Sequence, residues 1–127
     1  MGKGAAHVGP FTPILRIFDE AKARAFYVEW LGFEVLFTHR FGPEMPLYLG
    51  VIRDGAELHL SEHHGDTTPG TRVRCKVKDI DALTAELANR PYPYLNPGAP
   101  QTQDWGERDL TLTDPFGNKI TFYQDAG

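Results

Sequence analysis

The pattern of apolar and polar residues is similar in the two halves of the chain. In the first half a short apolar stretch, 13–17, leads to Asp19, a favourable N-cap residue, and then to a predicted helix over 20–31. One face of this helix carries apolar residues at spacings of three and four: Ala23, Phe26, Tyr27 and Trp30. Gly32 stands where a left-handed C-terminal cap belongs, so we expect a strand followed by a capped helix.

Three strand-like segments follow this helix. They cover roughly 33–40, 47–53 and 56–62. The Asp54-Gly55 pair between the last two is a strong signal for a two-residue hairpin turn. The first half of the chain is therefore predicted to run strand, helix and three strands.

The second half repeats this order. The predicted elements are a strand, a helix that Asp79 caps, and three shorter strands, at 72–77, 80–88, 92–95, 108–113 and 119–123. A turn over 114–118 joins the last two strands. Residues 15–19 also align with residues 75–79, which suggests an internal repeat.

This pattern predicts an α+β fold of two βαβββ repeats, at roughly 11–62 and 72–124. Each repeat forms a curved mixed sheet with a helix on its outer face, and the concave face must meet something else. Two such sheets, paired within a chain or between chains, leave a cleft that alternate strand residues line. We expect residues 1–10 to be a flexible leader and 11–127 to form a single domain.

Composition narrows the class of protein. The chain has 127 residues, 41% of them hydrophobic and 24% charged, which are ordinary values for one globular domain. The net charge of −4 argues against a general nucleic-acid surface. No apolar run approaches the roughly 18 residues that cross a bilayer, and the lone Cys75 suits a reducing compartment. We therefore expect a cytoplasmic protein that binds neither membranes nor nucleic acids.

Three segments, taken in order, resemble a known family. They are Asp19 through Phe33, with Ala25-Phe26-Tyr27 and Leu31-Gly32-Phe33, then Leu58-His59-Leu60-Ser61, then Trp105-Gly106-Glu107-Arg108-Asp109 continuing to Asp114-Pro115-Phe116-Gly117-Asn118. Their order and spacing resemble the glyoxalase and bleomycin-resistance (vicinal oxygen chelate) superfamily, and within it the bleomycin-resistance proteins. The resemblance covers roughly 11–123.

The resemblance implies a site without a metal. Enzymes of this superfamily hold a divalent cation with four inward side chains, and the corresponding positions here are Thr12, His59, Arg72 and Thr121. His59 is the one normal ligand among them, and Arg72 would place a permanent positive charge where the cation sits. We expect no metal, no cofactor and no catalytic residue, and hence no enzymatic activity.

The bleomycin-resistance branch implies a function instead. Its proteins sequester a drug in grooves between two paired protomers, which often exchange their first strand. This chain is accordingly expected to form a homodimer that confers antibiotic resistance by binding a bleomycin-type drug. Phe41 and Trp105 occupy positions resembling the aromatic pair that sandwiches the ligand, His59 and Ser61 would offer hydrogen bonds, and Gly106 would permit close backbone approach.

The charge of the ligand stays open at this point. Arg72, Arg74 and Lys76 share one face of a strand, and if that face lines the groove it favours an anionic ligand. Nearby acidic side chains could neutralise this strand, namely Glu62, Asp66, Asp104, Glu107 and Asp109. The strand could also be a solvated face outside the groove.

Two other functions therefore remain as alternatives. One is a metal-dependent enzyme like a glyoxalase or dioxygenase, with an altered metal site around His59 and either His63 or His64. Against it, the run 62–66 has the features of a solvated linker between the repeats. The second alternative is a binding module for an anionic metabolite, in which Arg72 and Arg74 would hold the ligand.

Overall fold

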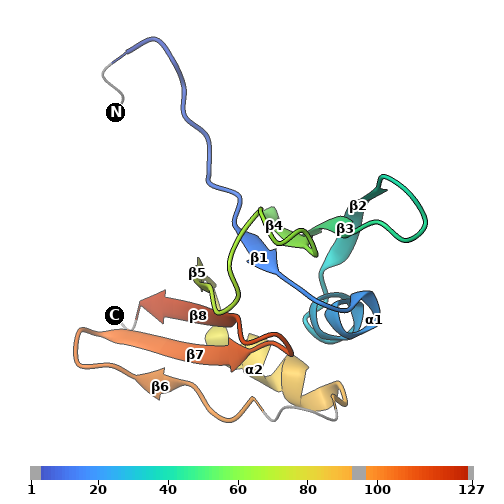
Figure 1. The fold of residues 1–127 in the computed structure, drawn as a ribbon. Coiled ribbons are helices and arrows are strands. Elements are labelled where there is room, and N and C mark those ends of the chain that lie inside the picture. Colours follow the sequence, from blue (N-terminus) through green and yellow to red (C-terminus); the bar gives the residue numbers. More distant parts are fainter. Residues whose placement is uncertain (1–3, 93–96, 126–127) are drawn as a thin grey trace.

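The computed structural model describes residues 4–92 and 97–125 (Figure 1). The first repeat forms one four-stranded sheet, here called sheet A, with the strand order β1-β4-β3-β2. Its elements are β1 (Ile14–Arg16), α1 (Glu20–Ala23), η1 (Arg24–Trp30), β2 (Glu34–Arg40), β3 (Leu47–Arg53) and β4 (Ala56–Ser61).

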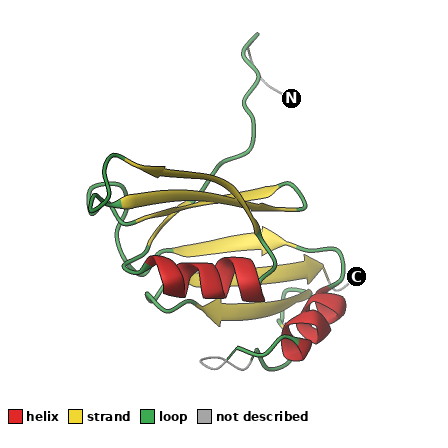
Figure 2. Cartoon of the chain, turned by 90° about the vertical axis from the view of Figure 1, so that its right-hand side faces the viewer, coloured by secondary structure: helices red, strands yellow, loops and turns green. Residues whose placement is uncertain are grey.

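The second repeat forms sheet B with the equivalent order β5-β8-β7-β6. Its elements are β5 (Arg72–Lys76), α2 (Ile80–Asn89), β6 (Gln101–Thr102), β7 (Glu107–Thr113) and β8 (Lys119–Asp125). Figure 2 shows the two sheets as two layers, one above the other. The predicted α+β fold of two βαβββ repeats is confirmed. The boundary expected at residue 10 stays a prediction.

A two-residue turn sets the register of one hairpin in sheet A. In sheet A, β3 and β4 are antiparallel neighbours joined by Asp54 and Gly55, whose φ angles are 50° and 84°. Both residues adopt the left-handed conformation that a two-residue hairpin turn requires, as the sequence predicted. Each repeat closes with a parallel pair, β1 with β4 and β5 with β8.

Alternate strand residues divide each sheet into two faces. One face packs into a continuous core with the helices, and the other is called here the open face. The open face of sheet A carries Ile14, Arg16, Phe37, His39, Tyr48, Gly50, Ile52, Glu57, His59 and Ser61. The open face of sheet B carries Arg72, Arg74, Lys76, Glu107, Asp109, Thr111, Lys119, Thr121, Tyr123 and Asp125.

The first helical segment begins as predicted and then changes its hydrogen-bond pattern. The Asp19 carboxylate accepts a hydrogen bond from the Lys22 amide at 2.9 Å, and Gly32 ends the segment with a φ of 77°. Residues 24–30 form a π-helix, with the Leu31 amide bonded to the Phe26 carbonyl. The apolar spacing predicted the buried face, whereas nothing in it distinguishes a π-helix from an α-helix.

One predicted strand falls mostly on residues that the structure does not describe. The expected strand over 92–95 lies mostly outside the described residues, and Tyr92 itself belongs to no strand. Its ring stacks on Trp30 with 4.9 Å between ring centroids. In the described residues the strand next to β7 is β6, at Gln101–Thr102.

The turn after β7 joins the two repeats. The Asp114 carboxylate accepts four hydrogen bonds, from the Tyr27 hydroxyl at 2.5 Å and from the Phe116 and Asn118 groups around the turn. Asn118 donates to the Arg16 carbonyl of β1 at 2.7 Å. Burial, together with the Asp114 carboxylate, raises the pKa of Tyr27 well above its ordinary value. The Asp-Pro-Phe-Gly-Asn turn is therefore a structural junction.

A second junction links the β3–β4 hairpin to α2. The Arg53 guanidinium binds both carboxylate oxygens of Glu86, at 2.7 and 2.9 Å, and also donates to the Leu31 carbonyl at 2.7 Å. The hydrogen bond from Arg53 lowers the pKa of Glu86. Because this pKa is lower in the folded protein, the stabilisation is present above the unfolded pKa of about 4.3 and is lost as the pH falls through the folded pKa.

We expect Glu86→Gln to lower the free energy of unfolding by about 1 kcal/mol at neutral pH, because it removes a charged bidentate partner from Arg53. The difference between the variant and the wild type should shrink as the pH falls below about 4. Urea unfolding at several pH values measures this. The matched control is Glu29→Gln, on an exposed residue of η1. A difference that does not change with pH would contradict the assignment.

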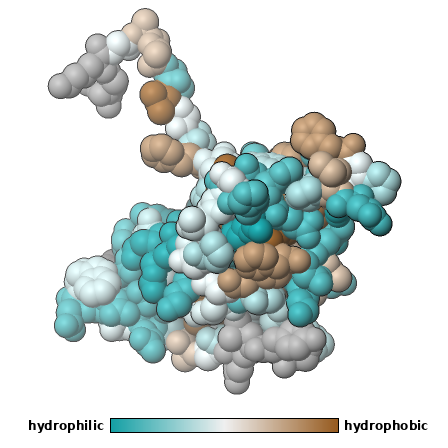
Figure 3. All heavy atoms as spheres, viewed as in Figure 1, coloured by the Kyte–Doolittle hydropathy of each residue, from teal (hydrophilic) through white to brown (hydrophobic). Residues whose placement is uncertain are grey.

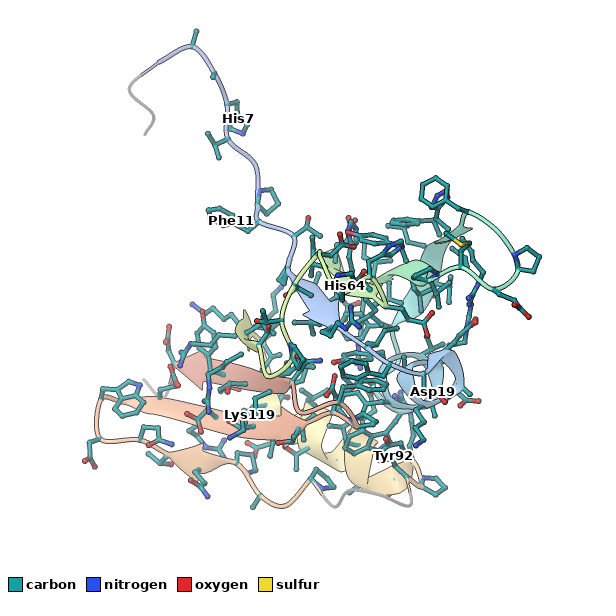
Figure 4. The ribbon with its side chains drawn as sticks, in the orientation of Figure 1. His7, Phe11, Asp19, His64, Tyr92 and Lys119 are labelled. Atoms are coloured by element: carbon teal, nitrogen blue, oxygen red, sulfur yellow. The ribbon has the colours of Figure 1, made fainter. Side chains whose placement is uncertain are left out.

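The segment before β1 extends away from both sheets. In Figure 4 the labelled side chains of His7 and Phe11 lie along this arm, and Phe11 is 95% exposed. None of the helices in residues 4–92 and 97–125 has the length and apolar character that crossing a bilayer requires.

Candidate functional site

The open face of sheet A holds His59, whose imidazole ring has two hydrogen-bonding neighbours. His59, on β4, lies opposite Gly50 on β3. Its Nδ1 atom is 2.7 Å from the Tyr48 hydroxyl, and its Nε2 atom is 2.6 Å from the Glu57 carboxylate. Burial, with Asp66 and Glu57, raises the pKa of Tyr48. Both ring nitrogens of His59 are therefore engaged by neighbouring side chains.

An aromatic ring lies next to this polar group. Phe37, on β2, lies opposite Gly50, and its ring is nearly parallel to that of Tyr48 at an angle of 10°. A Cβ atom at position 50 would collide with the Phe37 ring, so glycine is what allows the ring to lie flat on the sheet. The edge of His59 also meets the Phe37 ring.

Ser61 is held by its own loop. The residue is buried, its hydroxyl donates to the Asp66 carboxylate at 2.6 Å, and it accepts from the His63 amide at 3.0 Å. The run 62–66 thus folds back over the end of β4 and closes Ser61 off. His59 and Ser61 share the predicted strand face, but Ser61 already has both a donor and an acceptor partner.

Phe41 lies in the loop between β2 and β3. It is 76% exposed, and the edge of its ring meets His39 with 4.6 Å between centroids. Arg40 fixes this loop by donating to the Met45 carbonyl at 2.7 Å and to Glu20 at 2.9 Å. Figure 3 shows hydrophobic atoms gathered at the tip of this loop. Phe41 is thus presented outward on an anchored loop.

The open face of sheet B holds the basic strand. Arg74 donates a hydrogen bond of 2.5 Å to Glu107, and its guanidinium lies 4.2 Å from the centre of the Tyr123 ring. The Arg74 hydrogen bond lowers the pKa of Glu107, and the same bond raises the pKa of Arg74. Lys76 pairs with Asp125 at 3.1 Å. The strand's charge is therefore partly neutralised.

Arg72, Arg74 and Lys76 are all exposed and all lie on the face away from the core. These side chains lie on the open face of sheet B, and their place in a ligand groove stays a prediction. Of the acidic residues expected to neutralise them, Glu107 binds Arg74. Glu62 instead accepts from the Leu47 amide, and Asp66 binds Ser61.

Trp105 and Gly106 form the turn between β6 and β7. Trp105 is 68% exposed, and Gly106 has a φ of 86°, where residues with a Cβ are strained. This turn and the loop that carries Phe41 lie at opposite ends of the molecule (Figure 1). Within one chain, therefore, Phe41 and Trp105 do not face each other.

The cavities of one chain do not coincide with the predicted site. A cavity of about 580 Å³ lies between α2, β5 and the β3–β4 turn, and none of the predicted site residues line it. A smaller one, of about 240 Å³, includes Arg74 together with Glu57. Apart from Arg74, the predicted site residues lie outside these two cavities, on the two open faces and in the loops that carry Phe41 and Trp105.

The residues at the superfamily's metal positions do not fit a divalent cation. His59 has both ring nitrogens bonded, Arg72 is exposed and cationic, and the Thr121 hydroxyl pairs with that of Thr111 at 2.8 Å. Within residues 4–92 and 97–125, no cluster of three or more His, Cys, Asp or Glu side chains has metal-binding geometry. This donor set is unsuitable for the metal that the superfamily's enzymes use.

Sequence reasoning missed Tyr48, Glu57 and Phe37. A usable signal existed, because the two-residue turn at Asp54-Gly55 sets the register of β3 against β4. That register places Tyr48 diagonally across from His59. Glu57 is two residues before His59 on the same strand face.

Comparison with known proteins is consistent with this geometry. The family described as "Glyoxalase superfamily protein" matches residues 4–127. No curated protein sequence matches the chain significantly.

Several solved structures share the fold. A bleomycin-binding protein solved with bleomycin is 23% identical, with a TM-score of 0.72 over 93% of this chain and 99% of that one. An antibiotic-binding protein from Streptomyces sp. CB03234 is 27% identical, with a TM-score of 0.72 over 96% and 99%. A member of the glyoxalase/bleomycin resistance protein/dioxygenase superfamily from Sphaerobacter thermophilus DSM 20745 is 25% identical, with a TM-score of 0.69 over 94% and 98%.

Proposed function

Because this chain belongs to the glyoxalase superfamily, as its sequence motifs predicted, we propose that it binds and sequesters a small molecule, with a bleomycin-type antibiotic as the leading candidate. Two structural relatives support this choice: one was solved with bleomycin, and another is named an antibiotic-binding protein. The protein would act in the cytoplasm and give resistance by removing free drug, without altering it. The unsuitable donor set at the metal positions supports this non-catalytic role.

We infer that the ligand grooves form between two copies of the chain. The observation that carries this proposal is the placement of Phe41 and Trp105 at opposite ends of the molecule, both largely exposed. In a symmetric dimer each surface patch meets a patch of the partner, so one open face of sheet A can oppose one open face of sheet B. Such a pairing would place Phe41 of one protomer and Trp105 of its partner along the same groove.

A second candidate function is the binding of an anionic metabolite. Its support is the open face of sheet B, where Arg72 is exposed and Arg74 keeps several donors beyond its bond to Glu107. A carboxylate or phosphate would suit this face. The two candidates differ in the ligand's charge and in their dependence on aromatic rings.

We expect bleomycin to bind the purified protein and Trp105→Ala to weaken that binding by about 1 to 3 kcal/mol, because an exposed indole is an anchor for a flat ring. Isothermal titration calorimetry measures the affinity, and sedimentation in the same buffer measures the oligomeric state. The control is Phe18→Ala, an exposed aromatic residue outside both open faces.

Three results would count against the proposed function. They are the absence of any heat with bleomycin, an affinity unchanged by Trp105→Ala, and a monomer at the concentrations where bleomycin binds. If a simple carboxylate such as benzoate binds more tightly than bleomycin, the second candidate is favoured.

A further inference from the structure

Three side chains on the open face of sheet A form a hydrogen-bonded series with a defined direction. The Glu57 carboxylate has no hydrogen to donate when ionised, so the Nε2 atom of His59, at 2.6 Å, must carry one. In a neutral imidazole the other nitrogen is then an acceptor. Nδ1 therefore accepts from the Tyr48 hydroxyl at 2.7 Å. With its hydrogen committed, the Tyr48 oxygen offers only lone pairs to a ligand.

The charges around Tyr48 act in the same direction. Burial raises the pKa of Tyr48 most, and burial disfavours charge of either sign; the carboxylates of Asp66 and Glu57 raise it further because they repel negative charge. Asp66 lies in the loop after β4, and Glu57 is on β4 itself. A ligand that brings positive charge to the Tyr48 oxygen is therefore favoured over one that brings negative charge.

Three neighbouring elements each carry a basic side chain. On β1, the Arg16 guanidinium lies over the Phe18 ring, 4.8 Å from its centre, and its buried Nη1 atom has no hydrogen-bond partner among the described residues. On β5, Arg74 is bonded to Glu107. On β2, His39 lies opposite Tyr48 in the sheet and meets the Phe41 ring. None of these side chains is bonded to Tyr48, Glu57 or the His59 ring among the interactions of the described residues.

An aromatic surface stands next to the acceptor. Phe37 is 38% exposed and nearly parallel to Tyr48, and Gly50 provides the space in which its ring lies. Flat, polarisable and cationic groups pack well on such rings. The same face thus combines a ring surface, an acceptor oxygen and nearby negative charge.

We propose that the open face of sheet A binds a flat cation that carries N–H donors, such as an amidinium or an arylammonium group. Tyr48 accepts the ligand's hydrogen bond, Phe37 packs on its ring, and Glu57 is a positioning residue that sets the direction of the bond through His59. The inference rests on the proposed function, since it takes this face as one wall of the ligand groove. It adds the chemistry of the ligand group that this wall recognises.

Three small aromatic probes separate the contribution of the ligand's charge from that of its N–H donors. Benzamidine is a flat cation with N–H donors, phenyltrimethylammonium is a cation without them, and benzoate is a flat anion with acceptors alone. Two-dimensional NMR of the full chain at about pH 9, where imidazoles are ordinarily neutral and Tyr48 keeps its proton, follows the signals of Tyr48, Phe37 and Gly50. We expect benzamidine to shift these signals at the lowest concentration and benzoate to leave them unchanged.

Variants test the assigned roles. Tyr48→Phe removes the acceptor oxygen and keeps the ring, so benzamidine affinity should fall about tenfold while phenyltrimethylammonium affinity stays constant. Glu57→Gln frees the direction of the bond and removes a negative charge, so the preference for benzamidine over benzoate should fall at least severalfold. Thr38→Val is the control, since it removes a hydroxyl from an exposed β2 residue on the other face of sheet A.

The inference is overturned if benzoate shifts these signals as readily as benzamidine does, if no probe shifts them, or if Tyr48→Phe leaves benzamidine affinity unchanged. Its failure is separable from that of the proposed function. Bleomycin binding that depends on Trp105, without a benzamidine response, would remove this inference alone. A benzamidine response without bleomycin binding would remove the proposed antibiotic ligand and leave the recognition chemistry in place.

Discussion

Replacing Asp114 by alanine is expected to lower the free energy of unfolding by about 3 to 5 kcal/mol, one of the two largest effects of any single substitution that we predict. The side chain is 4% exposed and accepts four hydrogen bonds. Its removal leaves the buried Tyr27 hydroxyl and two turn amides without an acceptor, and a buried donor without a partner costs more than an ordinary hydrogen bond contributes. Urea unfolding followed by circular dichroism measures the change.

The control for this substitution is Asp125→Ala, at the exposed end of β8. Asp125 pairs with Lys76 at the surface, so its loss should change the free energy of unfolding by less than about 0.5 kcal/mol. Tyr27→Phe should recover part of the loss when combined with Asp114→Ala, because it deletes the orphaned hydroxyl. Equal effects of the two aspartate substitutions would show that the turn is not a junction.

The two tryptophans of the chain should respond in opposite ways to the same substitution. Trp30 is 2% exposed, stacks on Tyr92 and donates to the Leu87 carbonyl at 3.1 Å. We expect Trp30→Ala to cost about 3 to 5 kcal/mol of stability, because it opens a large cavity between the first helical segment and α2. Trp105→Ala, by contrast, should leave the free energy of unfolding nearly unchanged and affect ligand binding instead.

This pair is its own control, since the residue type and the substitution are identical. Thermal unfolding of both variants, combined with bleomycin titration of each one that folds, gives the comparison. A loss of stability of several kcal/mol in Trp105→Ala would mean that this side chain is structural, and its assignment to a groove would then be withdrawn. A stable Trp30→Ala would contradict the position of Trp30 in the core.

The fold was largely predictable because its signals are local. Asp19 and Asp79 cap the predicted helices through their own side chains, and the Asp54-Gly55 turn fixes the register of a whole hairpin. Such effects depend on residues that are neighbours in sequence. The order of elements then followed from the spacing of apolar residues.

The errors arose where distant packing decides the structure. Tyr92 reads as a strand residue, yet it stacks on Trp30, which is far from it in sequence. The π-helix over 24–30 was equally hidden, because the spacing of buried residues fits both kinds of helix.

The candidate site was predictable in part. Sequence reasoning placed His59 and Ser61 on one strand face, and the register puts both on the open face of sheet A, but the role of their neighbours depends on how side chains bond across strands. The distances that join Tyr48, His59 and Glu57 are set by rotamers, which periodicity does not specify. The wide separation of Phe41 and Trp105 was likewise inaccessible, since it depends on how the two repeats are arranged in space.

Two of the four edge strands, β6 in sheet B and β2 in sheet A, differ in how they can meet another polypeptide. β6 has two residues, which is too short to template a further strand at that edge of sheet B. β2 has seven residues and stands at the margin of sheet A with Val35 and Leu36 uncovered. The bulge between Val35 and Phe37 breaks the regular spacing of its outward amides and carbonyls. We expect that irregularity to disfavour fibre-like stacking through β2, the longest edge strand of the described residues.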